Sequence, residues 1–224
     1  MRIIKASVEQ ITPPIDGMEF LKAIEAAGRV CYKSEEKITD ESAPAFVAKL
    51  IKSGHEAMIE HAPSISMKFI CDRGVSHEIV RHRLFSFAQE STRYCNYGEK
   101  DMVFILPCWF EEELKKYLLI RGCFDIDDEE RPNANAESYY WMESMLSAEI
   151  IYGNLISLGW PPQQARSVLP NSLKTEIIVT GNVREWRHFF RLRTAKTAHP
   201  QMQEVANIAL EMLRAQIPVV FDDI

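Results

Sequence analysis

The segment "RHRLFSFAQESTR", residues 81–93, gathers side chains that bind anions. An Arg-His-Arg run at residues 81–83 is followed, after a gap of seven residues, by a Ser-Thr-Arg run at 91–93. Guanidinium groups match phosphate oxygens bidentately, and hydroxyl groups complete such contacts. This chemistry predicts a binding site for a phosphate or another small polyanion.

Two later segments, "QARSVLP" and "GNVREWRHFFRLR", add arginines on stretches whose apolar residues favour packing against a core. Guanidinium groups from distant parts of the chain could therefore converge on one cationic pocket. The alternative for any one of them is a solvated helix face on which arginine pairs with Glu or Asp. The arginines in question are Arg81, Arg83, Arg93, Arg166, Arg184, Arg187, Arg191 and Arg193.

Histidine and cysteine offer two further chemistries. In "GHEAMIEH", His55 and His61 are six residues apart, whereas the zinc motif H-E-x-x-H places both His on one helical face. We therefore expect structural histidines and assign no metal; a metal-dependent hydrolase using His55, Glu56 and His61 is kept as an alternative. Cys108 in "LPCW" could be a nucleophile, but no basic neighbour activates its thiol, so a buried cysteine is expected.

The composition is that of a soluble globular protein. With 224 residues, 46% of them hydrophobic, the chain can form one large core, and we expect one domain over residues 1–224. The five scattered cysteines form no disulfide framework, which indicates the reducing cytoplasm. No run approaches the ~20 apolar residues of a membrane helix, and a sequence pI of about 5.6 argues against general nucleic-acid binding.

Hydrophobic periodicity predicts helices and strands without a regular βαβ rhythm. Strands are expected at 2–11, 64–71, 102–107 and 174–182. Helices are expected at 18–30, 40–54 (with Asp40 as N-cap), 72–83, 108–120, 137–158, 161–170, 183–193 and 200–216. The acidic stretch 124–138 is expected to be a solvated loop, and the Arg-His-Arg run should lie at or near the C-terminal end of its helix. The predicted class is α+β, with a central, largely antiparallel sheet flanked by helices.

The pattern R-H-R-x7-S at residues 81–91 resembles the signature of the flavin-dependent thymidylate synthase family. Three further segments resemble blocks of that family in the same order: "SGHEAMIEH", "ARSVLP" and "GNVREWRHFFRLR". The resemblance spans roughly residues 29 to 200. A lone R-H-R would be weak evidence, whereas four ordered blocks are strong evidence.

The resemblance implies a reaction, the methylation of dUMP to dTMP. Methylenetetrahydrofolate would donate the carbon, FAD would carry the hydride, and NADPH would recharge the flavin. It also implies a homotetramer in which each active site draws on several subunits. The alternative is a non-catalytic nucleotide or anion-binding module that uses the same arginine pocket.

The resemblance also assigns ligands to individual residues. The implied flavin contacts are Arg81, His82, Arg83, Gln89, Asn182, Val183, Arg184, His188, Ala57 and Cys31. The implied dUMP contacts are Glu78, Ile79, Val80, Arg81, Gln89, Glu90, Ser91, Thr92, Arg93, Arg166 and Arg193. Ala57 and Cys31 stand where the family often has hydroxyl residues, and Gln89 stands where some members have Glu. Residues 81–93 would thus contact both the flavin and dUMP, and the seven residues between the two runs would separate the two contacts.

Three residues are implied in catalysis. Arg193 would lie against the uracil ring, where a fixed guanidinium stabilises the anion formed when N3 ionises and so raises the nucleophilicity of C5. His55 would lie near the flavin and the folate, and Ser91 would bind phosphate or ribose. This chemistry needs no covalent enzyme nucleophile, in keeping with a sequence that shows no activated cysteine.

Overall fold

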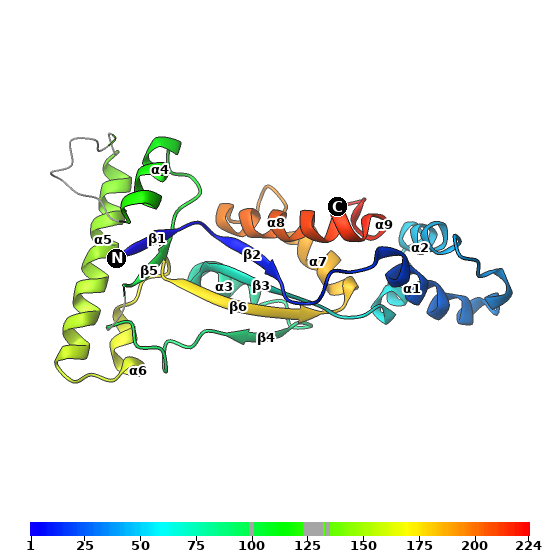
Figure 1. Cartoon of the computed structure of the whole chain (residues 1–224), viewed down its shortest axis with the longest axis horizontal. Helices are drawn as coiled ribbons and strands as arrows, with labels where there is room; N and C mark the ends of the chain where they lie inside the picture. The colour runs from blue at the N-terminus through cyan, green and yellow to red at the C-terminus, as the bar shows by residue number, and fades with distance from the viewer. Residues whose placement is uncertain (99–100, 123–131, 133–134) are drawn as a thin grey trace. The chain divides into compact units, whose positions relative to one another are not determined.

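The computed structural model describes residues 1–98, 101–122, 132 and 135–224, which form helices and short strands (Figure 1). Their contacts divide the chain into two compact units. Unit 1 comprises Met1–Ser7, Ile70–Ile79 and Gln89–Ile177, and unit 2 comprises Val8–Phe69, Val80–Ala88 and Ile178–Ile224. The predicted mixture of helices and strands is confirmed. Within the described part of the chain, no helix is long and apolar enough to cross a membrane.

The strands form two sheets. In the smaller one, β1 (Arg2–Ile4) pairs in parallel with β5 (Val103–Ile105), and Arg2 lies opposite Val103. The larger one is antiparallel and has the strand order β2 (Ser7–Gln10), β3 (Ile65–Asp72), β6 (Lys174–Gly181), β4 (Ser86–Gln89). Buried and partly exposed residues alternate along β3 and β6, as in strands with one covered face. The expected antiparallel sheet flanked by helices is therefore confirmed.

Unit 2 holds most of the helices that concern the site. They are α1 (Gly17–Tyr32), η1 (Glu35–Lys37), α2 (Ala43–Lys52), η2 (Glu56–His61), α7 (Val183–Arg193), α8 (Pro200–Gln216) and α9 (Pro218–Phe221). Asp16 begins α1 by accepting hydrogen bonds from the backbone N–H groups of Met18 and Glu19. Gly28 lets α1 approach α2 closely, because a Cβ at that position would lie 2.7 Å from Cε1 of Phe46.

An aromatic core fixes α7 within unit 2. Trp186 and Phe189 are fully buried and pack against Phe69 of β3 and against Phe85. The Phe85 ring lies so close to Gly181 that a Cβ there would be 2.1 Å from Cδ1, so no larger residue fits without a shift. This contact holds the segment that follows the Arg-His-Arg run against the end of β6.

Unit 1 contains the remaining helices, namely α3 (Arg73–Ile79), α4 (Glu112–Arg121), α5 (Ala136–Ser157), α6 (Pro162–Ala165) and η3 (Arg166–Val168). Asn135 begins α5 by accepting from the backbone N–H of Ser138. Met142 packs into a cluster with Leu114 and Leu118, and Tyr152 packs into a second cluster with Phe104. The burial of these apolar groups holds the unit together.

Several predicted boundaries are wrong. The first strand is two strands, β1 and β2, and the helix predicted from residue 108 begins at Glu112. The helix expected at 40–54 begins at Ala43; Ser42, not Asp40, occupies its N-cap position, with its hydroxyl turned to Glu25 and Thr39. The acidic stretch 124–138 lies largely outside the described residues, and the single domain over 1–224 stays a prediction.

The region around the Arg-His-Arg run also differs from expectation. The helix before it ends at Ile79, so the run lies in the turn that follows, near the helix end as predicted. The seven-residue gap is not all loop, because Ser86–Gln89 form β4. No residue of β4 is buried, so the strand lacks the apolar alternation that would have indicated it.

Candidate functional site

A cavity of about 880 Å³ in unit 2 joins the Arg-His-Arg run to α7 and η2. Residues from two of the three arginine-bearing segments line it, whereas Arg166 of the third segment does not. Its arginines are Arg81, Arg83, Arg184, Arg191 and Arg193. Predicted flavin contacts His82, Asn182 and His188 line the same cavity. A volume of this size is typical of sites that hold a cofactor.

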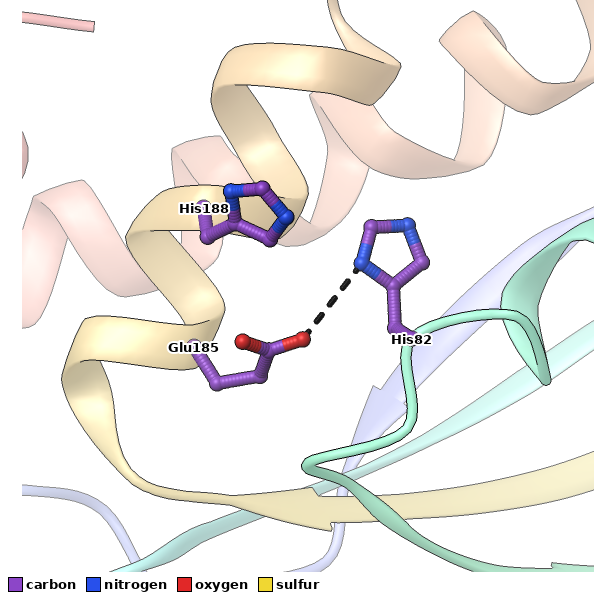
Figure 2. A group of neighbouring side chains, drawn as sticks. All are labelled: His82, Glu185 and His188. Carbon is purple, nitrogen blue, oxygen red and sulfur yellow. Dashed lines mark ion pairs between the residues drawn. The ribbon is translucent and has the colours of Figure 1, made fainter.

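His82 connects the two segments inside this cavity. Its Nε2 accepts a hydrogen bond from Nε of Arg193 at 3.0 Å, and its Nδ1 lies 3.5 Å from Oε1 of Glu185 (Figure 2). Burial lowers the pKa of His82 to about 4, and the positive charges of Arg193 and His188 act in the same direction. At neutral pH the ring is therefore uncharged, with its proton on Nδ1 facing Glu185 and its lone pair on Nε2 facing Arg193.

Glu185 is a site residue that the sequence reasoning missed. Glu185 lies three residues after Asn182, the N-cap of α7, and its backbone N–H donates to the Asn182 side chain at 2.9 Å. In the sequence, this spacing indicates only the start of a helix. Glu185 is only 5% exposed, and burial raises the pKa of its carboxyl, while the charge of His188 opposes that rise. The contacts from Glu185 to His82 and from His82 to Arg193 thus hold the guanidinium of Arg193 in a fixed orientation.

The same neighbourhood contains a set of metal-ligand atoms. Among the described residues, one atom each from His82, Glu185 and His188 lies within 4.8 Å of the others (Figure 2). A metal bound to Nδ1 of His82 would require the ring proton to be on Nε2. Two N–H donors, Nε2–H of His82 and Nε–H of Arg193, would then face each other, and their hydrogen bond would be lost. The geometry therefore favours the positioning of Arg193 over metal binding.

The alternative metal site at residues 55–61 lacks suitable geometry. Nδ1 of His55 is hydrogen-bonded to the hydroxyl of Tyr32 at 3.0 Å. Glu56 accepts from Arg187 at 3.2 Å and from Arg191 at 2.8 Å. With both groups engaged elsewhere, this set does not favour a metal-dependent hydrolase.

Some of the arginines follow the paired alternative instead of forming a ligand site. Arg187 forms an ion pair with Asp223 at 2.7 Å and so follows the paired alternative, although its side chain is fully buried and not solvated. Arg191 and Arg184 also pair with carboxylates, although both line the cavity. Arg81 and Arg83 are exposed and have no ion-pair partner among the described residues, so their charges remain available to a ligand.

A second group of predicted site residues lies in unit 1. Nη1 of Arg166 donates to Oγ1 of the buried Thr92 at 3.3 Å, although 74 residues separate them. Nε2 of Gln89 donates to Ser76 at 2.8 Å and to Thr175 at 3.2 Å, which fixes its amide. The structure thus brings Arg166 next to the 91–93 run, while their binding of an anion stays a prediction.

Glu90 and Ser91 lie beside this pair. Glu90 accepts from the Tyr97 hydroxyl at 2.9 Å and from Nζ of Lys174 at 3.1 Å. Burial and the Glu90 carboxylate raise the pKa of Tyr97, so the phenol stays protonated. Oγ of Ser91 accepts from the backbone N–H of Arg93, whose guanidinium lies over the exposed ring of Tyr94.

The remaining predicted contacts are divided between the units. The dUMP set has Glu78, Ile79, Gln89 to Arg93 and Arg166 in unit 1, and Val80, Arg81 and Arg193 in unit 2. The flavin set lies in unit 2 except for Gln89. Cys31 and Ala57 are exposed and do not line the cavity, whereas the side chains of Val183 and Ile79 are fully buried.

The burial of the remaining aromatic and cysteine side chains distinguishes core residues from exposed ones. Phe85, which lies between the two ends of the 81–93 segment, is a buried core residue, whereas Tyr94 is 80% exposed. Cys108 is half-buried rather than buried. The four described cysteines are free thiols, and Cys123 lies outside the described residues.

Comparison with known proteins agrees with the sequence motif at residues 81–91. The family described as "Thymidylate synthase complementing protein" matches residues 15–219. The chain belongs to this family of flavin-dependent thymidylate synthases. The "Flavin-dependent thymidylate synthase" of Corynebacterium aurimucosum is 38% identical over 202 residues, covering 89% of this chain and 78% of the relative. Those of Corynebacterium glutamicum (34% identical, 98% of this chain, 90% of the relative) and Mycobacterium leprae (33%, 97% and 87%) are also similar.

A flavin-dependent thymidylate synthase needs a flavin site, and the cavity of unit 2 fits one. Arg81 and Arg83 bring unpaired positive charge to it. Helix α7 begins at Val183, directly after the cavity residue Asn182, so the positive end of its helix dipole lies at the cavity. Phosphate groups of a nucleotide-type cofactor are the ligands that such an arrangement stabilises.

Acidification is expected to destabilise the flavin-dependent thymidylate synthase through His82. An unfolded His titrates near pH ~6.5, whereas burial lowers the pKa of His82 to about 4. Below pH ~6.5 the unfolded chain binds a proton that the folded chain does not, so the free energy of unfolding falls by up to about 3 kcal/mol as the pH drops to about 4.

This expectation can be checked by urea unfolding between pH 7.5 and pH 4 (about the range of the two pKa values) for the wild type and for His82→Gln. Glutamine keeps an acceptor for Arg193 but does not titrate, so the variant should lose less stability on acidification. Equal pH slopes for the two proteins would contradict the assignment of a neutral, buried His82.

Proposed function

We propose that this chain catalyses the reductive methylation of dUMP to dTMP, with FAD as the flavin, NADPH as the reductant and methylenetetrahydrofolate as the carbon donor. The supporting observation is the contact between the Arg-His-Arg run and α7, in which Nε of Arg193 donates to Nε2 of His82 at 3.0 Å. The family signature and the residue proposed to activate the substrate thus meet in one cavity.

Arg193 is the residue proposed to act on the uracil ring. Its fixed positive charge would stabilise the anion formed when N3 loses its proton, and the added electron density would make C5 a better nucleophile. His82 contributes by orientation, because a neutral imidazole accepts the Nε–H without adding a competing positive charge. A bound flavin supplies the hydride that converts the transferred carbon unit into a methyl group.

Other residues are proposed to bind and orient the ligands. Arg166 would bind the phosphate of dUMP with the help of Ser91 and Arg93, and Thr92 holds the Arg166 guanidinium in place. Arg81 and Arg83 would bind the phosphates of FAD at the cavity in unit 2. Asn182 would orient the cofactor at the start of α7 while capping that helix.

We also propose that the chain is a single family domain that assembles as a homotetramer in the cytoplasm. The family match runs from residue 15 to residue 219 and so includes ranges of both units. Predicted flavin contacts Cys31 and Ala57 are exposed and stand outside the cavity of unit 2. Exposed contact residues of this kind are consistent with a site that a second subunit completes.

The proposed function predicts a yellow protein that forms dTMP. The conjugated ring of an oxidised flavin absorbs at about 450 nm, so a protein that holds this redox cofactor is yellow. Purified protein should show this band and convert dUMP to dTMP when NADPH, FAD and methylenetetrahydrofolate are present. Both the spectrum and the product, resolved by chromatography, can be measured on one preparation.

Omission controls separate the proposed function from the alternatives. Product should disappear when NADPH or methylenetetrahydrofolate is omitted, or when the bound FAD has been removed, and should persist in the presence of a chelator. A non-catalytic binding module would bind dUMP or phosphate yet be colourless and leave NADPH unoxidised. A colourless protein without dTMP formation, even with added FAD, would contradict the proposal.

A further inference from the structure

Unit 2 contains a second cavity, of about 550 Å³, that the proposed function does not use. We name it the α1–α2 pocket, and its lining includes Arg29, Tyr32, Lys37, Phe46, Lys49 and His55. Three of its lining residues are Lys or Arg and none is Asp or Glu, although the whole chain has a net charge of −6. A local excess of positive charge in an acidic chain indicates a ligand with negative charge.

One side of the α1–α2 pocket is a rigid, flat surface. Glu25 is fully buried and accepts from Nε of Arg29 at 3.0 Å and from Nη2 at 2.7 Å. The hydroxyl of Ser42 donates to the other carboxylate oxygen of Glu25 at 2.8 Å. So held, the Arg29 guanidinium lies 4.2 Å from the centre of the Phe46 ring. An aromatic ligand can pack against a guanidinium and phenyl surface of this kind.

The other sides carry charge that no protein group neutralises. Lys37 and Lys49 are exposed and have no ion-pair partner within the described part of the chain. Tyr32 and His55 line the pocket near the start of η2 and are joined by a hydrogen bond of 3.0 Å. The pocket therefore combines an apolar, planar surface with two ammonium groups that can each bind a carboxylate.

The type of cation distinguishes between carboxylate and phosphate ligands. A diphosphate is bound bidentately by arginine guanidinium groups, but Nε and Nη2 of Arg29 already donate hydrogen bonds to Glu25. The charges left over are two lysines, which act as separate point charges. Of the ligands in the proposed reaction, the folate is the one that carries an aromatic ring followed by carboxylates.

We propose that the α1–α2 pocket binds the p-aminobenzoyl-glutamate half of the folate cosubstrate, an inference that rests on the proposed function. The aromatic ring would pack against Phe46 and Arg29, and the glutamate carboxylates would pair with Lys37 and Lys49. The pocket then determines affinity for the carbon donor.

Two double variants test this inference on the flavin-loaded enzyme. Lys37→Ala with Lys49→Ala removes the two pocket charges, whereas Lys52→Ala with Lys196→Ala removes two exposed charges of the same unit that line neither cavity. The pocket variant should raise the KM for methylenetetrahydrofolate roughly tenfold, a loss of about 1.4 kcal/mol. Its kcat, its KM for dUMP and its flavin content should stay at the wild-type values, as should all four quantities in the control.

A binding measurement keeps the pocket separate from the proposed reaction. Calorimetry with p-aminobenzoyl-glutamate alone should detect binding to the wild type and to the control variant but not to the pocket variant. If this lysine-dependent binding is seen in a protein that forms no dTMP, the proposed function fails while the ligand class of the pocket is upheld. If dTMP forms and the pocket variant keeps its KM for the folate, the pocket inference alone is overturned.

A third result would also overturn the inference. If the pocket variant loses flavin absorbance while the control keeps it, the lysines serve the cofactor and not the folate.

Discussion

Replacement of Arg193 by Ala is expected to lower the rate of dTMP formation by about 10²–10³-fold, the usual effect of removing one fixed group that stabilises developing charge. The guanidinium is held by its 3.0 Å hydrogen bond to His82, and His82 lies next to the buried Glu185. Because the charge is proposed to act on the ionised uracil ring, its loss should lower kcat. Steady-state rates of dTMP release at saturating dUMP measure the effect.

Two further variants make the Arg193 result specific. Arg193→Lys keeps a positive charge but cannot reproduce the planar fork or its Nε–H, so its activity should lie between those of the wild type and Arg193→Ala. Lys196→Ala removes a nearby exposed charge outside the cavity and should retain wild-type turnover. Flavin absorbance should be preserved in all three variants. Full turnover by Arg193→Ala would show that the ring-activating role is wrong.

Replacement of Arg187 by Met is expected to lower the free energy of unfolding by about 3 kcal/mol, as when one partner of a buried ion pair is removed. Arg187 is fully buried and joins α7 to the C-terminal Asp223, to the backbone oxygen of Val220 and to Glu56. The variant would leave these acceptors without their shared donor. Urea unfolding at neutral pH measures the loss.

Arg191→Met is the matched control for this effect. Arg191 contacts the same two carboxylates, Glu56 and Asp223, but is 44% exposed, so its removal should cost less than about 1 kcal/mol. Equal losses from the two variants would contradict a special role for the buried arginine.

The loss caused by Arg187→Met should also depend on pH. The hydrogen bond from Arg187 lowers the pKa of Asp223, and although burial alone would raise the pKa of Glu56, the hydrogen bonds and charges of Arg191 and Arg187 outweigh it. Carboxylates with a lowered pKa stabilise the fold at neutral pH, and this stabilisation is lost as the pH falls through their folded pKa values. The difference between wild type and variant should therefore shrink in acid.

The elements with strong local signals were predictable from the sequence. α7 spans Val183–Arg193 as expected, because Asn182 caps its start and its apolar residues recur with helical spacing. β3 was also predicted within one residue at each end, from its alternating apolar residues. β4 was not, since it buries no side chain and so leaves no periodicity.

The roles of individual arginines were less predictable. Arg184 and Arg187 are three residues apart on α7, yet Arg184 lines the cavity while Arg187 is fully buried against Asp223. Both occur in the same motif, and residue type alone does not tell which face of the helix the core covers. Glu185 was missed for the same reason, because its importance comes from burial beside His82.

The sequence by itself determined the family and the main helices and strands, because these follow from residue types and their spacing along the chain. The tertiary structure decided which charges are paired, that His82 is neutral at physiological pH, and that the α1–α2 pocket collects lysines without carboxylates. Those properties depend on burial and on distances between residues far apart in the sequence. Only the folded chain defines them.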